Sequence, residues 1–121
     1  MLIGMVLAED HETIVPIVEG LIARTYNMEN NETVDIPNPA LTVETGKRGT
    51  TVKWMVEQGV KILCSPPINL CELSYNRARE EELSFYRVPP NTTFKKLIQD
   101  LENGKLQPEN ILPMEEVEPS K

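Results

Sequence analysis

Histidine and cysteine are scarce in this sequence: its 121 residues include one histidine, His11, and two cysteines, Cys64 and Cys71. A Ser-His-Asp or Cys-His catalytic system would have to use His11, which lies between two acidic residues with no nucleophile motif nearby. Two cysteines and one histidine do not meet any four-ligand zinc spacing. Two cysteines also fall short of a disulfide framework, so we expect free thiols rather than a bridge.

Positive charge is also in short supply, because twelve Lys and Arg face nineteen Asp and Glu, which gives a net charge of -7. Such a protein repels a phosphate backbone, so we expect no nucleic-acid partner. No apolar run approaches the roughly 20 residues that span a bilayer. Residues 1–7 lack the basic start and the cleavage site of a signal peptide. We therefore expect an acidic, cytoplasmic protein with no membrane partner.

Aromatic side chains are few as well: one Trp, three Tyr and two Phe. The core must therefore come largely from Ile, Leu, Val and Met. Hydrophobic residues nevertheless make up 40% of the chain and charged residues 26%, which is a globular balance. The length is that of one compact domain.

The first part of the sequence predicts a strand, a helix and a hairpin. Residues 2–7 form a continuous apolar run, which is typical of a strand buried on both faces. Residues 14–23 are apolar on most sides and predict a short helix. Residues 24–28 and 33–36 flank a polar turn and predict a β-hairpin. Prolines then indicate a loop over residues 37–49.

The middle of the sequence predicts a helix, a strand and a second helix. Apolar residues recur at helical spacing from Val52, and Gly59 follows where a helix commonly ends in a left-handed residue. Residues 60–64 predict a strand, which the following prolines interrupt. Asn69, with Glu72 three residues later, has the capping-box pattern of a helix that runs to about residue 81.

The last part predicts a strand over residues 83–88 and a helix capped by Asn91 or Thr92 that ends near Gly104. Alternating strands and helices predict a three-layer α/β sandwich with a mixed, largely parallel five-stranded sheet. We assign residues 1–106 to this single domain. Residues 107–121 contain three prolines and four Glu and predict an extended, acidic tail.

The loop that contains Gly46, Lys47, Arg48 and Gly49 is a candidate anion site, since glycines and cations before a helix can cradle an anion through backbone amides. It lacks the glycine spacing of a P-loop. A cysteine at a helix N-terminus has a lowered pKa, but small buried cysteines are also common core residues. His11 likewise has two interpretations, a solvated loop residue or a metal ligand at the open end of a strand.

Acidic residues offer one further alternative. Glu9, Asp10 and Glu12 could hold a divalent ion for hydrolytic chemistry, although nuclease sites usually draw carboxylates from several elements. The run of three Glu at residues 80–82 is most simply a solvated helix end.

The order of motifs resembles the dinitrogenase iron-molybdenum cofactor biosynthesis family, over most of residues 1–106. The residues that carry the resemblance are Asn38-Pro39-Ala40, the glycine and arginine loop at 46–51, Gly59-Val60-Lys61, the strand and break at 62–66, Tyr86-Arg87-Val88, and the helix end at 102–106.

This resemblance implies a ribonuclease H-like sandwich and a non-enzymatic protein that binds or carries an anionic iron-sulfur or iron-molybdenum cluster. It places Asn38, the 46–49 loop and Ser65 at the binding face, where Lys47 and Arg48 would balance the charge of the cluster. His11, Cys64 and Cys71 are the candidate metal ligands. The expected partners are a cluster donor or acceptor protein, and a second copy of the chain.

One departure from the family motivates an alternative function. Family members carry a Phe-Gly-Arg-Ala type segment where this chain has residues 17–23. The chain could therefore be a protein-interaction or regulatory module that keeps the fold without the cluster. In that case the apolar residues of the tail would dock on a partner, namely Ile111, Leu112, Met114 and Val117.

Overall fold

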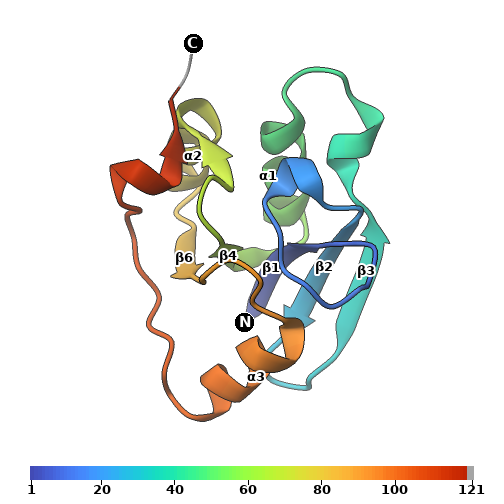
Figure 1. Cartoon of the computed structure of the whole chain (residues 1–121), viewed down its shortest axis with the longest axis vertical. Helices are drawn as coiled ribbons and strands as arrows, with labels where there is room; N and C mark the ends of the chain where they lie inside the picture. The colour runs from blue at the N-terminus through green and yellow to red at the C-terminus, as the bar shows by residue number, and fades with distance from the viewer. Residues whose placement is uncertain (120–121) are drawn as a thin grey trace.

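Five strands form the central sheet of the computed structural model, which describes residues 1–119. Their bounds are β1 (Leu2–Leu7), β2 (Ile22–Asn27), β3 (Thr33–Pro37), β4 (Val60–Ser65) and β6 (Ser84–Arg87). The order is β3-β2-β1-β4-β6, and β2 is antiparallel to both of its neighbours while β1, β4 and β6 are parallel. The sheet is therefore mixed, with β2 running against the other four strands (Figure 1).

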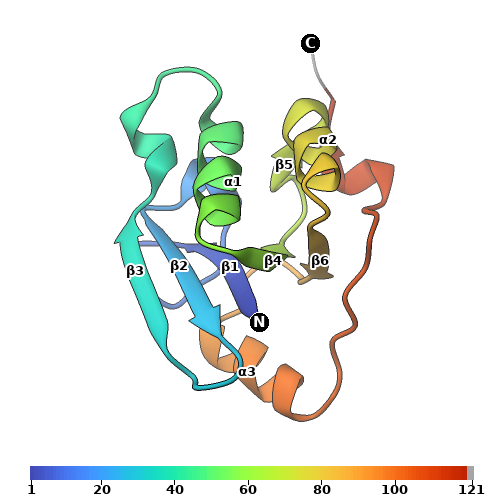
Figure 2. The ribbon, with the colours of Figure 1, turned by 180° about the vertical axis from the view of Figure 1, so that it is seen from behind.

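Three α-helices cover the sheet within the described residues. Helices α1 (Lys47–Glu57) and α2 (Glu72–Glu80) lie on one face, and α3 (Phe94–Glu102) lies on the other (Figures 1 and 2). Ile3, Met5 and Leu7 of β1 pack on the α3 side, whereas Val6 packs on the α1 and α2 side. The continuous apolar run of β1 follows from this burial on both faces. None of the helices in residues 1–119 has the length and hydropathy that a membrane span requires.

Residues 14–23 do not form the predicted helix, and that prediction is wrong. Within this stretch the structure has a 3-10 turn, η1 (Ile17–Glu19), before β2 begins. The N–H groups of Val15 and Leu21 donate instead to carbonyls of β1, at 3.0 Å in both cases. The side chains of Ile14 and Ile17 belong to this loop and are buried in the core, which explains why both residues are apolar. Gly20 allows the close approach, since a Cβ there would lie 2.9 Å from the carbonyl oxygen of Leu7.

The start of α2 also differs from the prediction. Asn69 is not the N-cap, because its Oδ1 accepts a hydrogen bond from the backbone N–H of Ile17 at 2.9 Å. A two-residue strand, β5 (Leu70–Cys71), follows, and Cys71 is the N-cap with Ser74 as its capping-box partner. Asn69 therefore ties two loops together rather than starting a helix.

The helix caps elsewhere are partly as predicted. Gly59 and Gly104 have left-handed φ values of 90° and 67° just after α1 and α3, as their positions indicated. The N-cap of α3 is neither Asn91 nor Thr92 but Thr93, whose Oγ1 accepts a hydrogen bond from the N–H of Lys96 at 3.1 Å.

Residues 109–118, which we call the C-terminal segment, pack against the domain instead of extending away from it. Phe85 of β6 forms a β-bridge with Glu109, and the segment ends in η3 (Met114–Glu116) and the short strand β7 (Val117–Glu118). β7 pairs with β5 in a parallel arrangement. The side chains of Leu112 and Val117 are buried in the core beneath α1 and α2. The last two residues of the predicted tail lie outside the described part of the chain.

Candidate functional site

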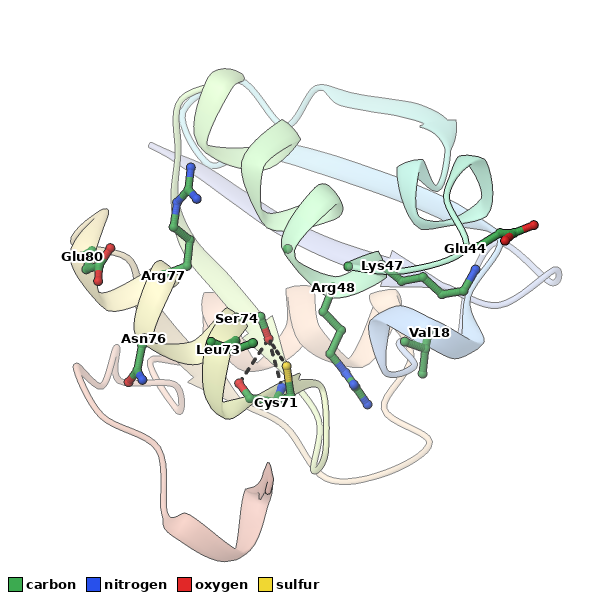
Figure 3. Close-up of a pocket in the computed structure, with 12 residues that line it drawn as sticks. Val18, Glu44, Lys47, Arg48, Cys71, Leu73, Ser74, Asn76, Arg77 and Glu80 are labelled. Carbon is green, nitrogen blue, oxygen red and sulfur yellow. Dashed lines mark hydrogen bonds between the residues drawn. The ribbon is translucent and has the colours of Figure 1, made fainter. Parts of the chain in front are cut away.

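A pocket of about 730 Å³ opens between the first turn of α1 and helix α2, and we call it the α1–α2 pocket (Figure 3). The sequence prediction named five of the residues that line it: Gly46, Lys47, Arg48, Gly49 and Cys71. Residues 46–49 and Cys71 are more than twenty positions apart in the sequence. The fold brings them together because β4 carries the chain from the end of α1 to the start of α2.

The first turn of α1 presents open backbone to the α1–α2 pocket. Gly46 is the N-cap and has no side chain to accept a hydrogen bond from the first amides of the helix. A Cβ at Gly46 or Gly49 would meet no heavy atom within 4 Å, so the backbone at both positions faces open space. Helix N-termini carry partial positive charge and unsatisfied N–H groups, which favour an anion.

The two cations of the loop lie differently. The Nζ of Lys47 donates to the carbonyl oxygens of Val43 at 2.7 Å and Ala40 at 3.3 Å. Lys47 therefore holds the loop that precedes the helix. Arg48 extends toward Cys71 (Figure 3), and only 17% of its side chain is exposed. Its Nη2 lies 2.6 Å from Oε2 of Glu118, whereas its buried Nε has no hydrogen-bond partner among the described residues.

Cys71 is the thiol of the α1–α2 pocket. Its Sγ lies 3.2 Å from Oγ of Ser74, which also accepts a hydrogen bond from the Cys71 N–H at 3.0 Å. Partial burial by itself would raise the pKa of the thiol. Hydrogen bonds with the side chain and backbone of Ser74 and the charge of Arg48 outweigh this effect, so the pKa of Cys71 lies below its ordinary value.

Cys64 lies outside this pocket. Its side chain is buried in the core on the α3 side of the sheet, next to residues such as Ile62 and Leu97. Burial raises the pKa of the Cys64 thiol well above its ordinary value, so the thiol stays protonated. A protonated thiol without access to solvent is a poor metal ligand. Cys64 therefore fits the predicted role of a metal ligand poorly, and that role stays a prediction.

The other predicted residues also lie apart from the α1–α2 pocket. Asn38 is fully buried, and its amide bonds Ile17 and Gly20 through Nδ2 and Ala40 and Thr51 through Oδ1. This amide is fully used inside the protein, so it has no hydrogen bond left to offer a ligand. Ser65 is buried at the end of β4, and its Oγ has no hydrogen-bond partner among residues 1–119.

His11 is exposed, and its Nδ1 lies 3.9 Å from Oδ2 of Asp35 at the β3 edge of the sheet. His11 and the two cysteines do not assemble one site. In the described part of the chain no group of three or more His, Cys, Asp and Glu is placed to hold a metal ion.

Two carboxylates of the acidic cluster after β1, those of Asp10 and Glu12, accept hydrogen bonds from backbone N–H groups. Asp10 accepts a hydrogen bond from the hydroxyl of Thr13 at 2.6 Å and others from the N–H groups of Thr13 and Glu12 at 2.8 and 2.9 Å. These bonds, above all the one from the Thr13 hydroxyl, close a turn and lower the pKa of Asp10. Oε1 of Glu12 accepts the N–H of Lys95 in the first turn of α3 at 2.8 Å. These carboxylates bind the backbone, which argues against the hydrolase alternative.

Sequence reasoning missed Glu118 and seven of the residues that line the pocket. The seven are Val18, Glu44, Leu73, Ser74, Asn76, Arg77 and Glu80. Ser74 follows Cys71 at capping-box spacing, so the pattern could have been found had Cys71 been considered as an N-cap. Glu118 reaches Arg48 only because the C-terminal segment folds back, and no local pattern in the sequence indicates this.

The fold belongs to the α/β class, with a mixed five-stranded sheet and helices on both faces in the part of the chain described above. One solved structure with this fold is the apo form of the orange protein from Desulfovibrio gigas. It has a TM-score of 0.72 and 9% identity, over 88% of this chain and 91% of that chain. Another is the NMR structure of a Thermotoga protein of the DUF35 family that bears a provisional NifB assignment. It has a TM-score of 0.68 and 16% identity, over 93% of this chain and 96% of that chain.

No family model matches the chain, and no curated protein matches it significantly. At 9% and 16% identity, the two structures show a shared fold alone. Membership of the dinitrogenase iron-molybdenum cofactor biosynthesis family stays a prediction.

Proposed function

We propose that this protein binds and carries an anionic metal-sulfur cluster, of the iron-sulfur or iron-molybdenum type, in the α1–α2 pocket and without catalysing a reaction. The observation that carries the proposal is the meeting of three groups at one pocket. These are the partly buried side chain of Arg48, the uncapped amides at Gly46–Gly49 and the Cys71 thiol. The cluster is cargo in this proposal, delivered by a donor protein and passed to an acceptor.

Each of the three groups suits one property of such a cargo. Arg48 is a permanent cation that lines the pocket of an acidic protein, and it would balance the negative charge of the cluster. The amides of the first turn of α1 would donate to its sulfides. The lowered pKa of Cys71 favours the thiolate, which is the form that binds metal.

The structural neighbours support the proposal to a limited extent. One of them was solved in an apo form, and the other bears a provisional NifB assignment. The resemblance of the motif order to the nitrogenase-cofactor family points the same way. The ribonuclease H-like form of the fold is part of this proposal, and it is supported by the sheet order and by the single antiparallel strand β2.

Anaerobic reconstitution with iron, sulfide and molybdate tests the proposal. We expect the wild-type protein to gain visible absorption and a stoichiometric amount of metal, measured after gel filtration. Arg48→Gln should lose most of this uptake, because it removes the positive charge that lies beside Cys71 in the pocket lining. Arg79→Gln is the matched control, since Arg79 lies over the ring of Tyr75 and outside the pocket lining. Wild-type protein without absorption or bound metal would contradict the proposal.

The alternative function, a protein-interaction module that docks through apolar residues of the tail, now depends on fewer of those residues. Leu112 and Val117 are buried in the protein's own core, while Ile111 and Met114 are exposed. The double variant Ile111→Ser/Met114→Ser, compared with wild type by light scattering, tests whether these two side chains join a second copy. A wild-type monomer would count against this alternative.

A further inference from the structure

The C-terminal segment places a carboxylate against Arg48, one of the residues that line the α1–α2 pocket. Glu118 lies opposite Cys71 in the register of β5 and β7, and its Oε2 is 2.6 Å from Nη2 of Arg48. Arg48 is the cation that the proposed function assigns to an anionic cargo. The protein therefore already holds one negative group at the place where the cargo's charge would lie.

Other contacts attach the C-terminal segment, so that Glu118 is not needed for this purpose. The N–H of Leu112 donates to the hydroxyl oxygen of Tyr75 at 3.0 Å. The N–H of Ile68 donates to the carbonyl oxygen of Glu116 at 2.8 Å. The carboxylate of Glu116 also bonds the guanidinium of Arg87. The segment is thus held along its length before it reaches Arg48.

The ion pair between Arg48 and Glu118 has the properties of an exchangeable contact. Glu118 lies at the end of β7, and 45% of its side chain is exposed. An ion pair with one partner this exposed contributes little to stability. The Nε of Arg48 has no hydrogen-bond partner among the described residues, but it is buried. An anion that enters the α1–α2 pocket would therefore meet the guanidinium at the nitrogen that a replaceable carboxylate occupies.

We propose that Glu118 is a built-in competitor for the anionic cargo at Arg48. While the pocket is empty, the Glu118 carboxylate neutralises Arg48. When an anion arrives, it takes the guanidinium, and the Glu118 side chain turns to solvent. This inference rests on the proposed function and adds its regulation: the affinity for cargo is set below the value that Arg48 alone would give, which favours release to an acceptor.

Binding of tetrathiomolybdate, a sulfur-containing dianion that serves as a simple probe for the cargo, tests the inference by anaerobic titration. Glu118→Gln keeps the size of the side chain and removes its charge. We expect it to bind the probe about fivefold more tightly than wild type, which is the loss of a partly exposed ion pair. Glu115→Gln is the matched control, because it makes the same change in net charge at an exposed residue of the same segment. It should bind like wild type.

A second measurement separates failure of this inference from failure of the proposed function. The rate at which iodoacetamide alkylates Cys71 does not need any cargo. With Glu118 neutral, the charge of Arg48 acts on the Cys71 thiol alone, and we expect alkylation about twofold faster or more in Glu118→Gln than in Glu115→Gln.

The outcomes are distinct. Equal affinities of wild type and Glu118→Gln for the probe would overturn the competition by Glu118 and leave the proposed function standing. If none of the proteins binds the probe or a reconstituted cluster, the proposed function fails and the alkylation rates decide the inference. Equal rates would then overturn it, and a faster rate in Glu118→Gln would support Glu118 as the group that masks Arg48.

Discussion

The two faces of the sheet contain the same ingredients, a helix N-terminus and a cysteine thiol, but only one face leaves them available. On the α3 face, Thr93 and Glu12 accept the first amides of the helix, and Cys64 is buried in the core. On the face of α1 and α2, the first turn of α1 has no side-chain cap and Cys71 reaches the α1–α2 pocket. A helix N-terminus or a thiol becomes a candidate binding group only where the fold leaves its N–H groups unpaired or its sulfur accessible.

The reactivity of the two thiols should show the largest difference between the faces. Cys64 can react only when its surroundings open, whereas Cys71 is accessible in the native state. We expect iodoacetamide to modify Cys71 on the order of 1,000-fold faster than Cys64 at neutral pH. Peptide mass spectrometry on the wild-type protein measures both rates at once. Comparable rates would show that the α3 face is more open than the structure indicates.

Removing the cap of α3 should have a moderate effect on stability. Thr93→Ala deletes the oxygen that accepts the N–H of Lys96, and we expect a loss of about 1 kcal/mol in the free energy of unfolding. Thr93→Ser keeps an oxygen at the same position and is the matched control. Denaturation by urea measures both variants. If the alanine variant is as stable as the serine variant, the cap does not distinguish the α3 face.

The pH dependence of stability should have opposite signs for the two thiols, with a small amplitude. The raised pKa of Cys64 stabilises the fold below the ordinary thiol pKa, and this contribution is lost as the pH rises toward the folded-state value. The lowered pKa of Cys71 contributes above the ordinary pKa, and its share is lost as the pH falls through the folded-state value.

Unfolding of the wild type, Cys64→Ala and Cys71→Ser between neutral and alkaline pH tests these signs. Relative to wild type, Cys64→Ala should gain stability as the pH rises, and Cys71→Ser should lose it. The same trend in both variants would mean that the two thiols have similar surroundings.

Local sequence patterns were enough to predict those parts of the fold that are determined by residues close together in the chain. The apolar run of β1, the hairpin of β2 and β3, and the glycines after α1 and α3 all follow from short-range rules. Where a distant contact decides the structure, the same rules failed. Ile14 and Ile17 are apolar because they fill the core under a loop, and Asn69 binds the backbone of Ile17 rather than a helix.

The candidate site also has one part that the sequence predicts and another that depends on distant contacts. The 46–49 loop could be found from its glycines and cations. The sequence does not tell, however, that Lys47 bonds its own loop while Arg48 lines a pocket together with Cys71. The two cysteines have equal standing in the sequence. Only the packing of the sheet shows that Cys64 points to the α3 side and that Cys71 begins α2 in the pocket. The contact of Glu118 with Arg48 depends on the whole path of the C-terminal segment.

Anaerobic reconstitution of two cysteine variants tests the central claim, that the α1–α2 pocket holds the cargo, most directly. Metal bound per chain is measured after iron, sulfide and molybdate are supplied to Cys71→Ser and Cys64→Ala. The account predicts that Cys64→Ala retains the uptake of the wild type and that Cys71→Ser loses most of it. Uptake that survives in Cys71→Ser and disappears in Cys64→Ala would contradict the account.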